Sequence, residues 1–100
     1  MTTWNKCDME FYPAEYEYGK TDCIVKIDNG DIRVEYRGGK SLLIFEGDEH
    51  GIGHYRLKAT THEGRGTLHL LPSNVPDDAV LEGWYYEDKQ RGMWRIHLSN

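Results

Sequence analysis

Hydrophobic and polar residues alternate with a period of two along most of the chain, a pattern that predicts β-strands rather than helices. The clearest runs cover residues 23–28 and 31–36, with Asn29 and Gly30 between them. Asn-Gly between two alternating runs is the strongest short signal for a two-residue hairpin, because both turn residues take positive φ. Such a turn pairs Val25 with Val34 and keeps the apolar side chains on one face.

The remaining runs extend this pattern to eight predicted strands. Besides the hairpin, they cover residues 5–11, 41–45, 54–60, 66–71, 79–87 and 92–99. The predicted connections are an irregular stretch at 16–20, a tight turn at Gly38-Gly39, a loop at 47–53, a turn at 62–65 and a proline-containing loop at 72–78. Short connections without crossover helices favour antiparallel pairing. We therefore predict an all-β fold, an antiparallel meander of about eight strands closed into a small barrel, as a single domain over residues 1–100.

The alternation also predicts which side chains fill the barrel. One face of each strand is apolar, and these faces must point inward together. The predicted core consists of Val25, Ile27, Ile32, Val34, Leu43, Phe45, Leu57, Leu68, Leu70, Trp94 and Ile96.

Two short segments near the C-terminus resemble a known class of barrels. Leu81-Glu82-Gly83-Trp84 and Gly92-Met93-Trp94-Arg95-Ile96, at the end of a short meander, are similar to the calycin-like barrels of the lipocalin and avidin type. The resemblance implies that Arg95 packs across a tryptophan of the first strand, for which Trp4 is the candidate. Calycins carry a glycine two residues before that tryptophan, and this chain has Thr2 there.

Composition and charge narrow the range of partners. The formal net charge is −5, and residues 1–50 hold eleven acids against six Lys and Arg. An acidic chain repels phosphate, so we do not expect a nucleic-acid partner unless one face is locally basic. No run approaches the length of a membrane helix, and residues 1–6 lack the apolar run of a signal peptide. We expect no membrane association and a cytoplasmic location.

The two cysteines fit that location. Cys7 and Cys23 are too few for a disulfide framework and lack metal-ligand spacing. We interpret both as reduced thiols. They face each other if the first two strands pair, so a disulfide between them stays open.

Motifs for catalysis, metal binding or cofactors are not evident. Five histidines are present, without the helix or cysteine spacing of a zinc site. We interpret His62 and His69 as solvated side chains on outward faces. The acidic loop 47–51 could hold a hard cation, but a solvated loop is favoured. We therefore predict no catalytic or metal residues and no cofactor.

Aromatic residues give the better functional lead. In the closing hairpin, a register that pairs Trp84 with Arg95 and Glu82 with His97 sets an indole beside a guanidinium. The leading hypothesis is a non-enzymatic binding domain that takes a small molecule at the barrel mouth or a protein on its surface. The predicted ligand-binding residues are Tyr36, Tyr55, Trp84, Tyr85, Arg95 and His97.

Two alternatives stay open. In the first, the outer face of strand 41–46 docks a protein partner or a second copy through Leu42 and Ile44, with Arg33 on the charged rim. That interface would give a weak homodimer, unless the segment around Tyr16 folds over it. In the second alternative, the chain is a small enzyme that uses His54 or His97 with nearby acids.

Overall fold

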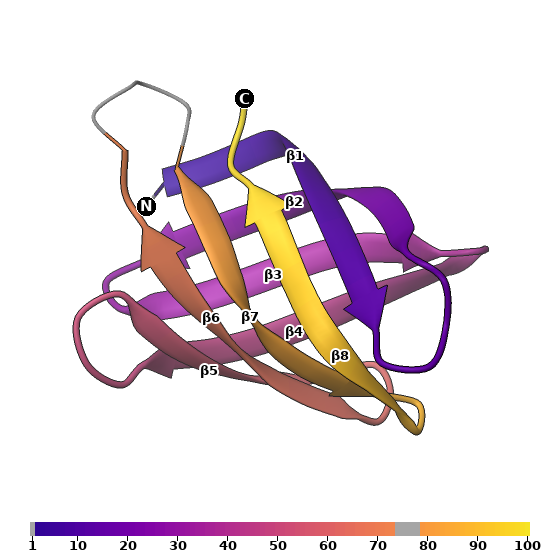
Figure 1. Cartoon of the computed structure of the whole chain (residues 1–100). Coiled ribbons are helices and arrows are strands. Elements are labelled where there is room, and N and C mark those ends of the chain that lie inside the picture. The colour runs from indigo at the N-terminus through magenta and orange to yellow at the C-terminus, as the bar shows by residue number, and fades with distance from the viewer. Residues whose placement is uncertain (1, 74–78) are drawn as a thin grey trace.

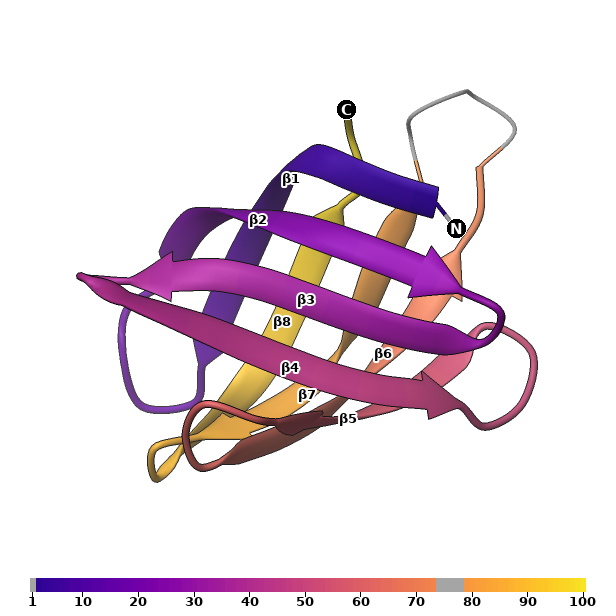
Figure 2. The same ribbon diagram turned by 180° about the vertical axis from the view of Figure 1, so that it is seen from behind.

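The computed structural model describes residues 2–73 and 79–100, which form a closed antiparallel barrel (Figures 1 and 2). The strands follow one another around the barrel in chain order, and β8 pairs with β1 to close it. All-β architecture, eight strands and closure are thereby confirmed. The strands are β1 (Thr2–Pro13), β2 (Gly19–Asp28), β3 (Asp31–Gly38), β4 (Ser41–Glu49), β5 (His54–Ala59), β6 (Gly64–Leu71), β7 (Val80–Glu87) and β8 (Gln90–His97).

The β2–β3 hairpin forms in the predicted register. Asn29 and Gly30 take φ values of 51° and 89°, as the two-residue turn requires. Val25 then lies opposite Val34, with both side chains inside the barrel. Of the predicted loop over 72–78, residues 74–78 lie outside the described residues.

The core matches the predicted inward face closely. Eight of the eleven predicted core residues are buried, and Ile27, Leu43 and Leu70 are half-buried and pack against them. The structure adds Cys7, Met9, Cys23, Tyr36, Tyr55, Ala59, Leu81, Tyr85 and Leu98 to the buried set. An eight-stranded barrel has an interior just wide enough for side chains, which fits this filled core.

The β3–β4 turn lies one residue later than predicted. It uses Gly39 and Lys40, so Phe45 pairs with Val34 rather than with Ile32. The inward and outward faces are unchanged, because the register moves by two. The predicted 47–53 loop is also shorter, since β4 continues to Glu49. Gly47 allows this, because a Cβ there would overlap the carbonyl oxygen of Arg56 on β5.

The β7–β8 register differs from the predicted one by two residues. Trp84 lies opposite Met93 and Glu82 lies opposite Arg95, so the predicted pairs Trp84–Arg95 and Glu82–His97 are wrong. The cause is a two-residue turn at Asp88 and Lys89, whose φ values are 48° and 70°. Neither residue is a glycine, so the usual hairpin signal is missing from the sequence.

Connections alternate between the two ends of the barrel. We call the A end the one that carries the connections 14–18, 39–40, 60–63 and 88–89, at the lower right in Figure 1. The opposite B end carries the turns at 29–30 and 50–53 and the N- and C-terminal segments. Within the described residues there is no helix long and apolar enough to cross a membrane.

Candidate ligand-binding site

Aromatic rings fill the barrel interior towards the A end. Phe45 packs edge-on against Trp94 with ring centroids 5.0 Å apart, and Phe11 packs edge-on against Tyr85 at 5.2 Å. Tyr36 contacts both Phe11 and Phe45. These rings fill this part of the barrel interior with side chains.

A hydrogen-bonded cluster covers these rings at the A end. The Tyr36 hydroxyl donates to Glu87 Oε2, and His62 Nε2 lies 2.6 Å from the same oxygen. His62 Nδ1 in turn lies 2.9 Å from Thr61 Oγ1. Burial, followed by the bond to the Glu87 carboxylate, raises the pKa of Tyr36 above its ordinary value. The cluster therefore ties β3, the 60–63 connection and the end of β7 together.

His62 is consequently not the solvated residue that the sequence suggested. Its side chain is 11% exposed, and its ring packs edge-on against Phe45. The strand alternation ends at Ala59, so parity could not place a residue in the following connection. His69, in contrast, is exposed on the outer face of β6, as predicted.

Tyr86 lies outside this cluster, at the centre of a cationic row. On the outer surface it is the cross-strand partner of Arg65 on β6 and of Arg91 on β8. Lys58 on β5 is the next residue along, opposite Arg65. Together with Lys89 in the β7–β8 turn, these residues form what we call the Tyr86 rim: Lys58, Arg65, Tyr86, Lys89 and Arg91.

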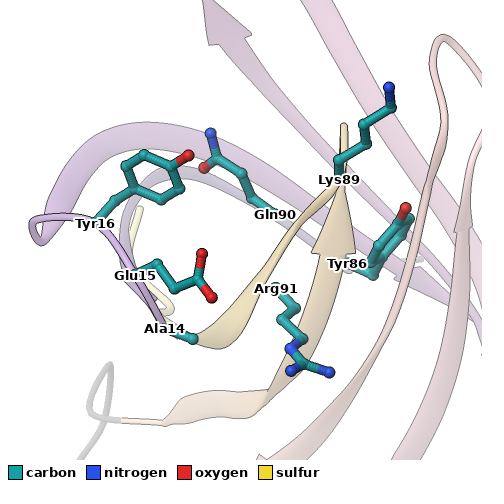
Figure 3. Close-up of a pocket in the computed structure, with 7 residues that line it drawn as sticks. All are labelled: Ala14, Glu15, Tyr16, Tyr86, Lys89, Gln90 and Arg91. Atoms are coloured by element: carbon teal, nitrogen blue, oxygen red, sulfur yellow. The ribbon is translucent and has the colours of Figure 1, made fainter.

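Two surface depressions meet at Tyr86. The first has a volume of about 310 Å³ and lies between the β1–β2 connection and the start of β8. Figure 3 shows the Tyr16 ring beside the Gln90 side chain there, with the Glu15 carboxylate between the two segments. The second, of about 780 Å³, is lined on the other side of Tyr86 by Lys58, His62, Glu63 and Arg65.

The cations of the Tyr86 rim are not ion-paired to any residue that the structure describes. In the part of the chain that the structure describes, Lys58, Arg65, Lys89 and Arg91 make no ion pair. Elsewhere on the barrel, Arg95 is held by Glu82 at 2.6 Å, and Arg33 and Lys26 share Glu35. Five further cations outside the rim also make no ion pair with a described residue: Lys6, Lys20, Arg37, Lys40 and Arg56. The Tyr86 hydroxyl donates to Glu63 Oε1 at 3.2 Å, which leaves the ring face beside the arginines. The rim thus gathers four cations around Tyr86, with two acids in the same depressions, Glu15 in the smaller and Glu63 in the larger.

The six predicted ligand-binding residues do not share one site. Tyr36, Tyr55 and Tyr85 are buried inside the barrel, and Tyr55 lies near the B end of β5. Trp84, Arg95 and His97 point outward, where Trp84 is 44% exposed. His97 Nε2 bonds Glu10 Oε1 at 2.8 Å rather than Glu82. Since alternate residues of a strand face opposite ways, the interior tyrosine hydroxyls cannot line the surface that these three residues occupy.

The Arg-on-Trp packing implied by the calycin resemblance is also not formed. Arg95 bonds Glu82 on the outer surface, whereas Trp4 packs against the interior core. The resemblance to calycins is limited to the closed antiparallel barrel.

The predicted partner face is exposed. Leu42 is 42% exposed and Ile44 is half-buried, both on the outer side of β4. With the observed register, Ile44 lies beside Glu35 and Leu42 beside Arg37, while Arg33 pairs with Glu46 further along. The segment around Tyr16 does not cover them, since Tyr16 lines the depression beside Gln90. Docking on this face stays a prediction.

His54 and His97 were the histidines predicted for an enzyme. His54 lines a surface depression that has no Asp or Glu among its lining residues. His54 faces His69 across β5 and β6, with Nδ1 atoms 3.5 Å apart. His97 bonds Glu10 on the exposed outer surface. The described residues contain no group of three His, Cys, Asp or Glu side chains placed to hold a metal ion.

Sequence reasoning missed the Tyr86 rim because its residues are dispersed. Lys58, Arg65 and Arg91 are separated by many residues and adjoin only through the strand registers. The alternation of inward and outward residues could have found them, because Lys58, Arg65 and Arg91 are each an outward residue near the A end of a strand. The correct β7–β8 register was needed to place Arg91 beside Tyr86.

Comparison with known proteins finds no matching family model, no matching curated protein and no matching solved structure. The functional argument therefore depends on the geometry of the barrel and its rim.

Proposed function

We propose that this chain is a non-enzymatic binding domain whose ligand is a small anion with a flat ring, held at the Tyr86 rim. The observation that carries the proposal is the cross-strand row of Lys58, Arg65 and Arg91 on both sides of Tyr86, in which no cation makes an ion pair with a described residue. A guanidinium on each side of an aromatic ring can bind an anionic group while the ring stacks on a planar one.

The two depressions support this choice of location. Both are open to solvent and share Tyr86, so a small ligand could bind there without displacing the core. Concave sites with a few convergent polar groups are the usual form of small-molecule sites. In this respect the protein would differ from the calycins it resembles in architecture, because its ligand would bind on the rim and not inside the barrel.

One observation favours a second candidate, an acid–base enzyme. Glu87, His62 and Thr61 form a carboxylate–imidazole–hydroxyl chain, and His62 lines the larger depression. A carboxylate that orients a histidine is a recurring arrangement for general base catalysis. The chain would act through His62, not through His54 or His97 as the sequence suggested.

The binding proposal is tested by NMR titration with inorganic phosphate, adenosine monophosphate and a short single-stranded DNA. We expect adenosine monophosphate to shift the amide signals of Tyr86 and Arg91 and to bind more tightly than phosphate. Arg65→Ala and Arg91→Ala should each weaken binding about tenfold, because each removes a charge-assisted hydrogen bond.

Arg37→Ala is the matched control. Arg37 is an exposed outward arginine of β3, away from the rim, so its removal should leave adenosine monophosphate binding unchanged. Equal losses in all three variants would contradict the site. Binding of DNA alone, with a steep salt dependence, would contradict a small-molecule ligand and indicate a polyanion surface.

A further inference from the structure

Cys7 and Cys23 lie directly opposite each other across β1 and β2. Directly opposed residues of antiparallel strands have Cα atoms about 4.5–5.5 Å apart, whichever kind of pair they form. Disulfides span Cα separations of about 4.4–6.8 Å. The backbone is therefore already placed for a disulfide, although both residues are present as free thiols.

The two side chains interact inside the barrel. Cys7 is fully buried and Cys23 is 3% exposed. The Cys7 thiol lies 3.5 Å from the Trp4 carbonyl oxygen, to which it donates. The neighbouring Cys23 thiol lowers the pKa of Cys7, and the Cys7 thiol, followed by burial, raises the pKa of Cys23. Within the pair, Cys7 is thus the thiol that ionises first and Cys23 the one that keeps its proton.

The C-terminal segment covers Cys7 from one side. Leu98 is buried, the Ser99 carbonyl accepts from the Lys6 amide at 3.0 Å, and Cys7 Sγ lies 3.9 Å from the same carbonyl oxygen. Residues 98–100 follow β8 and belong to no strand. Hydrogen bonds of the Leu98 amide, the Ser99 carbonyl and the Asn100 side chain hold this segment to the barrel. A segment outside the strand ladder opens locally at a lower free-energy cost than the ladder itself. Opening of this segment would give a small oxidant access to Cys7 without unfolding the barrel.

We propose that Cys7 and Cys23 are a redox-active dithiol, which a peroxide converts into an intramolecular disulfide between β1 and β2. The Cys7 thiolate attacks one peroxide oxygen, the O–O bond breaks, and the leaving hydroxide takes a proton to become water. Cys7 is then a sulfenic acid. The Cys23 thiol attacks the Cys7 sulfur, the S–O bond breaks, and the leaving hydroxide takes the Cys23 thiol proton and departs as a second water. Two thiols lose two electrons and one peroxide is reduced to two waters.

The test is intact-mass spectrometry of the purified chain after exposure to hydrogen peroxide. We expect the monomer to lose the mass of two hydrogen atoms, to take up no N-ethylmaleimide after unfolding in urea, and to return to the starting mass with dithiothreitol. The urea midpoint of the oxidised protein should be higher than that of the reduced protein, since a cross-link restricts the unfolded chain.

Single-cysteine variants separate the two roles. Cys23→Ala should stop at the Cys7 sulfenic acid, which dimedone traps, whereas Cys7→Ala should react much more slowly. A second variant that ends at Leu98 should oxidise faster than the full chain, because the cover over Cys7 is gone. A wild type that stays reduced under peroxide, or forms only disulfide-linked dimers, overturns the proposal. The binding function at the Tyr86 rim is independent of this result.

Discussion

Glu87 accepts hydrogen bonds from two side chains that burial has removed from water. The Tyr36 hydroxyl and the His62 ring both approach Oε2, and the Glu87 side chain itself is only 17% exposed. A buried donor that loses its acceptor costs the full desolvation of that group. One carboxylate thus accepts from two buried donors on separate segments, so its removal would leave both without a partner and destabilise the packing at the A end.

Glu87→Ala should consequently lower the free energy of unfolding by about 2–3 kcal/mol, because Tyr36 and His62 both lose their partner. The measurement is urea unfolding followed by tryptophan fluorescence. Glu63→Ala is the control, since Glu63 is exposed, its carboxylate accepts from the Tyr86 hydroxyl, and its backbone bond to Asp88 is kept in the variant. Its effect should stay within about 0.5 kcal/mol. Similar losses in both variants would show that the cluster has no special role.

At the scale of the element, turn chemistry decided what could be predicted from sequence. The Asn29-Gly30 turn fixed its hairpin register, because its residue types demand positive φ. Asp88 and Lys89 adopt a similar turn without a glycine, so the alternation of β7 and β8 was predicted correctly and their pairing was not. A shift of two residues keeps every side chain on its face, which is why the core prediction survived both register errors.

The same turn gives a prediction for stability. Lys89 has a φ of 70°, a region that disfavours residues with a Cβ. Lys89→Gly should therefore raise the free energy of unfolding by about 0.5–1 kcal/mol, after allowing for the greater entropy of glycine in the unfolded chain. Thermal unfolding monitored by circular dichroism measures this. Lys40→Gly, in the other short A-end turn but without a positive φ, should instead be neutral or destabilising. A stabilised Lys40→Gly with an unchanged Lys89→Gly would contradict the turn argument.

At the scale of the whole molecule, stability should pass through a maximum between acid and alkaline pH. Burial raises the pKa of Glu35, but its bonds to Arg33 and Lys26 outweigh burial and leave that pKa below its ordinary value. A carboxyl whose folded pKa is lowered binds fewer protons when folded, so its contribution is lost as the pH falls through the folded pKa. Tyr36, whose pKa is raised, loses its contribution as the pH rises above about 10, the ordinary value for tyrosine.

Urea midpoints measured between pH 3 and pH 11 should show both losses. Glu35→Gln should flatten the acid side of the profile and leave the alkaline side unchanged. Tyr36→Phe should flatten the alkaline side and leave the acid side unchanged. The variant should lack the Tyr36 part of the stability loss above pH 10, which is up to about 1.4 kcal/mol per pH unit in the wild type. Identical profiles for both variants and the wild type would contradict these assignments.

The candidate site was less predictable than the fold, because it depends on how several strands are placed relative to one another. Strand faces depend on parity within one segment, whereas the Tyr86 rim depends on the relative positions of β5, β6, β7 and β8. Aromatic content led to the prediction of Tyr36 and Tyr85 as ligand-binding residues, and the structure places both in the interior. His62 and Glu87 lie where strands end and alternation gives no information.

Closure of the barrel restricts how a protein partner could recognise this chain. Each of the eight strands has a hydrogen-bonded neighbour on both sides, including β1 and β8. An extended peptide binds many sheet proteins by adding a strand to a free edge, with main-chain hydrogen bonds supplying the affinity. In the described strands only short stretches are paired on one side, such as 2–4 of β1, 19–22 of β2 and 41–43 of β4, so this mode has little edge to use. A protein partner would instead contact outward side chains or the loops. If a partner docks on the predicted face of β4, Leu42→Lys should weaken its binding without disturbing the hydrogen bonds between strands.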